Sequence, residues 1–203
     1  MSDSEIVHVI DDDVDVRQSL AFLLSTAGLA VRVYESAIAF LENLPGAGGC
    51  VVTDVRMPEM DGLELQRRLK SLDIALPVIV ITGHGDIALA VEAMKAGAVD
   101  FIEKPFDDET LIVAIRSALT RYAKDAQREC QMAEIRGRLK SLTDRERDVL
   151  GGLVAGKPNK IIAYDLGISA RTVEIYRANV MTKMQADSLS ELVRMALLES
   201  GAL

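Results

Sequence analysis

Short apolar runs alternate with longer amphipathic stretches through the first 120 residues of the chain. The apolar runs are rich in β-branched residues, a pattern that favours strands buried on both faces of a parallel sheet. The expected strands are 6–10, 30–34, 50–53, 77–81 and 99–102. The expected helices are 14–27, 36–43, 62–71, 86–96 and one that begins at 108. Five strand–helix units predict an α/β domain with a flavodoxin-like, five-stranded parallel sheet in the order 2-1-3-4-5.

The pattern changes after residue 122, where Arg, Lys, Glu, Gln and Ala dominate and no proline occurs before residue 140. Small or apolar residues recur there near a helical period, which favours a helical linker over 123–140, with a flexible hinge as the alternative. From residue 141 onward the pattern is helical throughout. The helices expected there are 144–155, 159–166, 170–184 and 189–199. The sequence therefore predicts an α/β domain over 1–122, a linker over 123–140 and an all-α domain over 141–203.

The two predicted domains differ in charge. The net charge of the chain is −8, but residues 1–122 hold 10 basic and 20 acidic side chains, whereas residues 123–203 hold 13 and 11. An acidic domain attracts cations, and a weakly basic one can approach nucleic acid. The two cysteines are too few for a disulfide framework and are expected as reduced thiols. Without a signal segment or a long apolar run, the expectation is a cytoplasmic protein that has no membrane contact.

Polar residues follow the predicted strands at the edge where their carboxyl ends meet, which is where ligands bind in such sheets. These residues are Asp11, Asp12, Asp54, Thr82 and Lys104. Asp54 is the candidate nucleophile for a phosphoryl group, because a carboxylate can accept one when nearby cations neutralise the charge. Lys104 is suited to stabilise the transferred phosphoryl oxygens, and Thr82 to hydrogen-bond the acyl phosphate.

A divalent cation would complete this chemistry. Mg²⁺ prefers oxygen ligands and keeps several waters, so two or three carboxylates are enough. Asp12 and Asp54 are the expected ligands, Asp11 holds the geometry of the site or a metal-bound water, and a backbone carbonyl near Arg56 completes the shell. Asp13 is expected to cap the first helix. A shift of register, with Asp12 and Asp13 as the acidic pair, stays open at this point.

Residues 159–184 have the form of a helix-turn-helix, in which Gly167 permits the turn and Ser169 caps the second helix. The apolar stripe expected in the core comprises Val173, Tyr176, Val180 and Met184. The residues expected to contact DNA are Lys160, Arg171, Thr172, Glu174, Ile175, Arg177 and Lys183. Cations among them can bind phosphates, while side chains near the start of the helix reach base edges. A small helical bundle with solvated charges is the alternative.

The first 120 residues resemble the receiver domain of two-component response regulators. The resemblance rests on Asp11-Asp12, Asp54, Met57-Pro58, Asp61-Gly62, Thr82 and Lys104-Pro105. It implies that Asp54 accepts a phosphoryl group from a sensor histidine kinase and that Mg²⁺ is required. It also implies that Thr82 and Phe101 form a switch pair, in which the hydroxyl turns toward the phosphoryl group and the aromatic ring moves inward.

Residues 141–198 are similar to the LuxR-type DNA-binding domain, although Tyr176 stands where that family often has His. The similarity is carried by Leu142-Thr143, Arg145-Glu146, Val149-Leu150, Gly156, Asn159-Lys160, Ile162-Ala163, Leu166, Ser169, Arg171-Thr172-Val173-Glu174, Arg177, Met181, Lys183 and Leu192-Val193. Together, the two resemblances point to a response regulator of the NarL/FixJ class. Segments 82–86 and 90–106 are particularly similar to those of regulators of nitrogen-fixation genes.

The resemblance implies a transcription factor in which phosphorylation of Asp54 promotes receiver dimerisation and DNA binding. The implied partners are a sensor histidine kinase, double-stranded promoter DNA, RNA polymerase and a second copy of the chain, with a monomer before phosphorylation. It is not expected to be an enzyme beyond hydrolysing its own phosphoaspartate.

Two other function classes make different predictions. A Mg²⁺-dependent aspartyl-phosphate phosphatase or phosphotransferase would turn over small phosphate esters, although Arg56 stands where its second acid is expected. A phospho-dependent protein adaptor would show no salt-dependent affinity for DNA.

Overall fold

The computed structural model describes residues 6–44, 48–83 and 87–199, and its amino-terminal part folds around one parallel sheet. The strands are β1 (Ile6–Ile10), β2 (Ala30–Tyr34), β3 (Cys50–Asp54), β4 (Val78–Thr82) and β5 (Asp100–Glu103). Their order, β2-β1-β3-β4-β5, confirms the predicted flavodoxin-like arrangement. β4 begins one residue later than expected because Pro77 has no N–H for the ladder and contributes only its carbonyl, which accepts from Val51 N at 2.8 Å.

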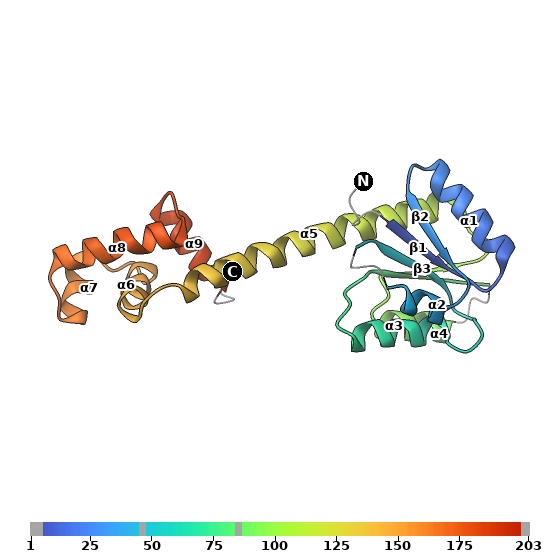
Figure 1. Cartoon of the computed structure of the whole chain (residues 1–203), viewed down its shortest axis with the longest axis horizontal. Coiled ribbons are helices and arrows are strands. Elements are labelled where there is room, and N and C mark those ends of the chain that lie inside the picture. Colours follow the sequence, from blue (N-terminus) through green and yellow to red (C-terminus); the bar gives the residue numbers. More distant parts are fainter. Residues whose placement is uncertain (1–5, 45–47, 84–86, 200–203) are drawn as a thin grey trace. The chain divides into compact units, whose positions relative to one another are not determined.

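Helices cover both faces of this sheet (Figure 1). One face packs against α1 (Val14–Thr26) and the first part of α5 (Asp108–Lys140), and the other against α2 (Ala37–Glu42), α3 (Gly62–Ser71) and α4 (Ile87–Ala96). Successive strand residues point to opposite faces. Val9 therefore packs with Leu24 and Ile115, whereas its neighbour Ile10 joins Phe40 and Leu65. Residue 86, the expected start of α4, lies outside the described residues.

The carboxy-terminal part is helical. It contains α6 (Asp144–Val154), α7 (Asn159–Leu166), α8 (Ala170–Met184) and α9 (Leu189–Glu199). Its core includes Val149, Ile162, Val173, Val180 and Leu192. The chain divides into two compact units, residues 1–125 and 126–203. No helix within the described ranges is both long enough and apolar enough to cross a membrane.

The helix α5 takes part in both units. It runs from Asp108 to Lys140 and so includes residues 123–140. Its first turns bury Leu111 and Ile115 in the sheet domain, and its last turns bury Ile135 in the helical domain. A single helix therefore supplies side chains to two hydrophobic cores.

The side chain of His8 is fully buried in the sheet domain. The ring of His8 on β1 lies 5.9 Å from that of Tyr34 and 5.4 Å from that of Phe40, centroid to centroid. Its Nδ1 and Nε2 lie 3.3 Å from the Tyr34 hydroxyl and the Gly48 carbonyl. A neutral ring that accepts at Nδ1 and donates from Nε2 satisfies both groups. Burial lowers the pKa of His8 below its usual value, with Arg32 adding to the shift and the Gly48 carbonyl opposing it.

We expect His8 to make the sheet domain less stable as the pH falls below about 6.5, the usual histidine pKa. The folded-state pKa is lowered, so the unfolded chain binds the proton first. The stabilisation is complete above the unfolded pKa and is lost as the pH falls toward the folded pKa, by at most about 1.4 kcal/mol per pH unit. The free energy of unfolding, measured with urea at neutral and at mildly acidic pH, should fall more for the wild type than for His8→Gln. Equal losses in the two proteins would contradict this role.

Candidate functional site

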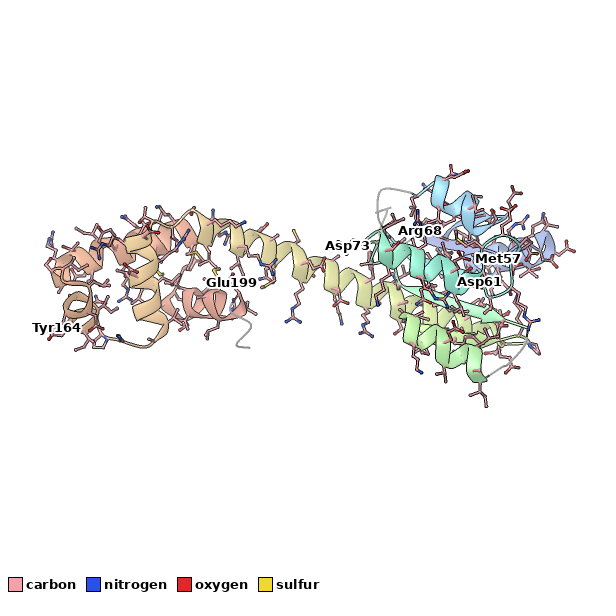
Figure 2. The ribbon with its side chains drawn as sticks, turned by 90° about the horizontal axis from the view of Figure 1, so that it is seen from below. Met57, Asp61, Arg68, Asp73, Tyr164 and Glu199 are labelled. Carbon is pink, nitrogen blue, oxygen red and sulfur yellow. The ribbon has the colours of Figure 1, made fainter. Side chains whose placement is uncertain are left out.

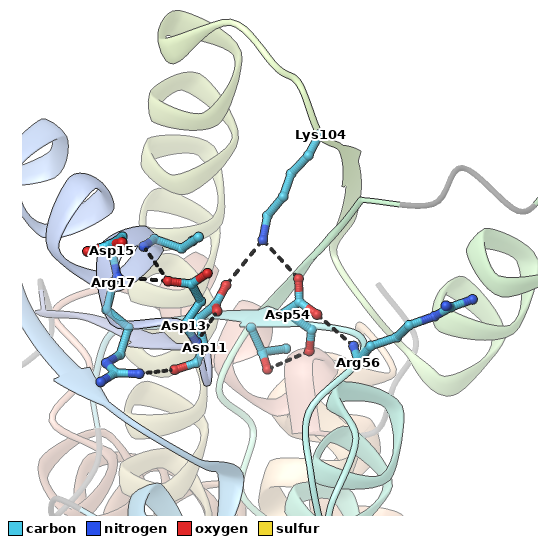
Figure 3. A network of polar contacts seen from close by, with 9 residues as sticks. Asp11, Asp13, Asp15, Arg17, Asp54, Arg56 and Lys104 are labelled. Atoms are coloured by element: carbon cyan, nitrogen blue, oxygen red, sulfur yellow. Dashed lines mark hydrogen bonds and ion pairs between the residues drawn. The ribbon is translucent and has the colours of Figure 1, made fainter.

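Three charged side chains meet at the carboxyl edge of the sheet (Figure 3). The ammonium nitrogen of Lys104 lies 3.1 Å from Asp11 Oδ2 and 2.9 Å from Asp54 Oδ1. Asp11 follows β1 and Asp54 ends β3, which are neighbouring strands in the middle of the sheet. The side chains of Asp11 and Asp54 are only 6% and 13% exposed, and that of Lys104 is 27% exposed. The two ion pairs are therefore partly shielded from water.

The turn after β1 assigns different roles to its three aspartates. Asp13 caps α1, because its Oδ1 accepts from Asp15 N at 2.8 Å and from Val16 N at 3.4 Å, and this confirms the expected cap. The N–H of Asp13 donates to Asp11 Oδ1 at 2.9 Å. Since the helix uses Oδ1 of Asp13 as its cap, the hydrogen bonds favour Asp11 and Asp12 over Asp12 and Asp13 as the acidic pair at this edge.

Asp54 is held by backbone groups. The N–H of Arg56 donates to Asp54 Oδ2 at 2.7 Å, while the Arg56 side chain is exposed. Gly62 packs closely against the backbone of Asp54, because a Cβ at position 62 would be 2.3 Å from the Asp54 carbonyl oxygen. Asp61 caps α3 by accepting from Glu64 N at 2.6 Å and stands at the start of that helix in Figure 2. Glycine at position 62 thus permits the close packing of α3 on β3.

Thr82 and Phe101 lie on the next two strands. Thr82 ends β4 and is 1% exposed, and its carbonyl accepts from Lys104 N at 2.7 Å. Phe101 is half-buried on β5, pairs with Val80 and packs against the hydrophobic cluster beneath α4. The peptide between Lys104 and Pro105 is cis. The structure thus joins Asp11, Asp54 and Lys104 directly, links Thr82 to Lys104 through the backbone, and places Phe101 in the adjacent apolar layer.

Burial and neighbouring charges shift the pKa values of Asp11 and Lys104 in opposite directions. Burial raises the pKa of Asp11, although the Asp13 N–H and the Lys104 ammonium oppose the shift. Burial alone would lower the pKa of Lys104, but the carboxylates of Asp54 and Asp11 outweigh it and the pKa is raised. Lys104 is therefore an ammonium at neutral pH. Two carboxylates that share one ammonium leave the edge electronegative and favourable for a further cation.

The oxygen donors at this edge suit Mg²⁺. Asp11 and Asp54 contact the same ammonium, so one cation can reach both carboxylates. Asp12 is exposed, and its side chain makes no hydrogen bond or ion pair within the described residues. In the same part of the chain, no three His, Cys, Asp or Glu side chains are already gathered as a metal-binding group. The donors therefore fit the metal chemically, and the side chain of Asp12 would have to turn inward to reach it.

The helical domain contains the expected helix-turn-helix. α7 ends at Gly167, whose φ of 65° lies in the left-handed region that glycine favours. The hydroxyl of Ser169 caps α8 by accepting from Thr172 N at 3.0 Å. Val173, Val180 and Met184 are buried and Tyr176 is half-buried, which confirms the predicted apolar stripe. The core thus fixes which side of α8 is available to a ligand.

Four of the seven residues predicted to contact DNA are exposed. Arg171, Glu174 and Ile175 are exposed on α8, and Lys160 is exposed on α7. Arg177 and Thr172 are half-buried. The Thr172 hydroxyl also lies 2.8 Å from that of Ser169, so it is engaged in the cap.

Lys183 differs from the other predicted contacts. Its ammonium nitrogen lies 2.7 Å from Glu146 Oε2 and 3.3 Å from the Ser141 carbonyl oxygen. Glu146 is 3% exposed and completes a capping box with Thr143 by accepting from Thr143 N at 2.8 Å. The hydrogen bond from Lys183 and those from Thr143 lower the pKa of Glu146. We therefore infer that Lys183 anchors α8 to α6, because its ammonium group already forms an ion pair with the buried carboxylate of Glu146.

Comparisons with known proteins agree with this architecture. The family model of the response regulator receiver domain matches residues 7–116. The chain belongs to the response regulator family. The model of bacterial regulatory proteins of the luxR family matches residues 140–196 of this response regulator.

Similar proteins share both parts of this response regulator. It is 59% identical to the transcriptional regulatory protein FixJ of Azorhizobium caulinodans over 203 residues, which is 100% of this chain and 96% of that protein. The low-resolution structure of the response regulator StyR has a TM-score of 0.85 and 41% identity, covering 94% of this chain and 97% of that one. Full-length FixJ from B. japonicum has a TM-score of 0.62 and 52% identity, with both chains covered in full. The receiver fold and the LuxR-type domain are therefore those of a FixJ-like transcriptional regulator.

The hydrogen bond that Arg17 makes at this site was not predicted from the sequence. Its guanidinium donates from Nη1 to the Asp11 carbonyl oxygen at 2.7 Å (Figure 3). A basic residue near the start of a helix ordinarily carries a solvated charge. The only sequence signal for the role of Arg17 is its position six residues after Asp11.

We expect Gly62→Ala to destabilise the receiver, because the added methyl would meet the Asp54 carbonyl oxygen at 2.3 Å and backbone cannot move aside cheaply. A loss of about 1–3 kcal/mol is typical of such overpacking. Urea unfolding of the full chain measures it. Gly83→Ala is the matched control, since a Cβ there meets nothing within 4 Å. A loss no larger for Gly62→Ala than for Gly83→Ala would mean that α3 can shift away from β3.

Proposed function

We propose that this chain is a phosphorylation-controlled transcription factor, with a receiver over residues 1–122, a linker over 123–140 and a DNA-binding domain over 141–203. The observation that carries the proposal is the ammonium of Lys104 shared by Asp11 and Asp54, in a chain that also holds a capped helix-turn-helix. Its partners are a sensor histidine kinase, promoter DNA and RNA polymerase, and all of these meet it in the cytoplasm.

Asp54 is the proposed phosphoacceptor. One of its oxygens attacks the phosphorus of a phosphohistidine while the phosphorus–nitrogen bond breaks, and the leaving imidazole takes a proton from water. The ammonium of Lys104, 2.9 Å from Asp54 Oδ1, stands beside the phosphoryl oxygens that arrive there. Hydrolysis of the acyl phosphate by water then restores the carboxylate. The protein is its own substrate in this step and is not an enzyme for others.

A metal ion is the proposed cofactor of the step. The carboxylates of Asp11, Asp12 and Asp54 and the carbonyl of Arg56 would hold Mg²⁺, which supplies positive charge for the phosphoryl oxygens. The side chains of the protein bring the phosphoryl group and the acceptor oxygen together, and Asp11 keeps Lys104 directed at Asp54.

Phosphorylation is proposed to act through Thr82 and Phe101. The Thr82 hydroxyl turns to the phosphoryl oxygens, and the ring of Phe101 moves into the apolar layer against which it already packs. The neighbouring surface of α4 and β5 carries several exposed apolar side chains, although charged side chains such as Glu92, Lys95 and Asp100 are exposed there too. The exposed apolar side chains on and next to these elements are Ile87 (81%), Val91 (46%), Met94 (50%) and Val99 (37%). Dimerisation of phosphorylated receivers over this surface would bury them, with a monomer before phosphorylation.

A dimer of receivers would bring two helix-turn-helix domains to two half-sites, which raises the affinity through effective concentration. Lys160, Arg171 and Arg177 are the proposed phosphate contacts, and Thr172, Glu174 and Ile175 lie at the start of α8, where base edges come within reach. Nitrogen-fixation genes are the proposed targets, supported by the resemblance of segments 82–86 and 90–106 and by the similarity to proteins named FixJ.

We expect Asp54→Asn to abolish phosphorylation. After incubation with acetyl phosphate and Mg²⁺, the wild type should gain the mass of one phosphoryl group and elute as a dimer in sizing chromatography. Asp54→Asn should do neither. Asp13→Asn is the matched control, because asparagine also caps helices well and the acidic pair is left intact. An adduct on Asp54→Asn, or none on Asp13→Asn, would refute the assignment.

We expect Arg171→Ala to weaken DNA binding and to reduce the salt slope of the affinity by about one, as for the loss of one phosphate contact. Lys183→Ala should leave the slope unchanged and destabilise the helical domain, because it leaves Glu146 buried without its cation. Fluorescence anisotropy with a promoter fragment over a range of salt concentrations separates the two variants. A protein adaptor would show no salt-dependent affinity at all.

A further inference from the structure

Asp12 is the least supported member of the acidic site. Asp11 is fixed at three points, because its N–H donates to Tyr34 O at 3.3 Å, its Oδ1 accepts from Asp13 N at 2.9 Å and its Oδ2 accepts from Lys104. The Asp12 side chain is exposed and has no such partner within the described ranges. The direction of that side chain is therefore set by the backbone alone.

The peptide group between Asp11 and Asp12 is held by Arg17. The carbonyl of Asp11 and the N–H of Asp12 belong to one rigid plane. Arg17, half-buried on α1, donates from Nη1 to that carbonyl oxygen at 2.7 Å. The backbone of Arg17 is anchored in turn, because its N–H donates to Asp13 O at 3.0 Å in the first turn of the helix. The side chain thus spans from the helix back to the peptide that precedes Asp12 (Figure 3).

We propose that Arg17 is a positioning residue of the phosphoacceptor site, which holds the Asp11–Asp12 peptide plane so that the Asp12 carboxylate can turn toward Mg²⁺ beside Asp54. This inference rests on the proposed function, because it concerns the metal that phosphorylation of Asp54 requires. Arg17 acts through Asp11 and Asp12 and has no contact with the reacting atoms.

Charge and position predict opposite effects of Arg17 on metal affinity. A guanidinium near a divalent cation repels it, so a purely electrostatic role means that removing the charge strengthens Mg²⁺ binding. A positioning role means that removing the hydrogen bond weakens binding, since groups that orient metal ligands typically contribute about 10–100-fold in affinity. The sign of the change therefore distinguishes the two roles.

The test is a Mg²⁺ titration of the unphosphorylated full chain, measured by calorimetry, for the wild type, Arg17→Ala and Arg17→Gln. We expect about tenfold weaker binding for Arg17→Ala. Arg17→Gln should recover part of the affinity, because its amide can donate to the same carbonyl without the charge. Arg116→Ala is the matched control, since Arg116 also donates to a backbone carbonyl, that of Ala27 at 2.9 Å, at the other end of α1.

A second measurement excludes a general structural effect. The rate of phosphorylation by acetyl phosphate should need about tenfold more Mg²⁺ in Arg17→Ala, yet reach the wild-type maximum at saturating Mg²⁺. Affinity equal to or tighter than that of the wild type in Arg17→Ala overturns the proposal, as does equal weakening in Arg116→Ala. If Arg17→Ala unfolds at a lower urea concentration than Arg116→Ala, the Mg²⁺ affinity of Arg17→Gln is compared with that of the wild type instead. Weaker binding by Arg17→Gln then supports the proposal, and equal or tighter binding overturns it. A wild type that binds no Mg²⁺ would instead refute the proposed function itself.

Discussion

The ammonium of Lys104 is the group on which the acidic edge depends. Two carboxylates as buried as those of Asp11 and Asp54 repel each other strongly unless a cation lies between them. Lys104, which directly follows a third strand, provides that cation at 3.1 and 2.9 Å from the two oxygens. One side chain therefore ties together the ends of β1, β3 and β5. The raised pKa of Lys104 follows from the same two contacts.

The amino-terminal ends of α1 and α3 form the rest of the site. In a parallel sheet each strand that ends at this edge is followed by the amino terminus of a helix, where backbone N–H groups lack partners. Asp13 and Asp61 use such groups as caps, and the caps bring α1 and α3 up to the carboxyl ends of β1 and β3. Gly62 allows that approach where a Cβ would not fit. Arg17 and the N–H of Arg56 then hold the backbone of Asp11 and the carboxylate of Asp54.

The helical domain uses similar chemistry for a different purpose. Its buried carboxylate, Glu146, accepts from the Thr143 N–H and from Lys183, so one side chain both caps α6 and anchors α8. The anchor and the stripe that includes Val173 and Val180 fix the rotation of α8. Arg171, Glu174 and Ile175 are exposed as a consequence. The surface available to DNA is thus decided by what the other side of the helix buries.

The sequence by itself determined the elements, the strand order and the edge at which the polar residues gather. Runs of β-branched residues, caps such as Asp13 and Ser169, and breaks such as Gly167 act over a few residues, so their signals can be read locally. Only the tertiary structure decided which charge faces which. The pattern around Lys183 is that of an exposed basic residue, and its pairing with Glu146 depends on how α8 packs on α6. The bond from Arg17 to the Asp11 carbonyl depends in the same way on how the turn after β1 folds back on α1, because hydrogen bonds to backbone carbonyls leave no mark in residue type.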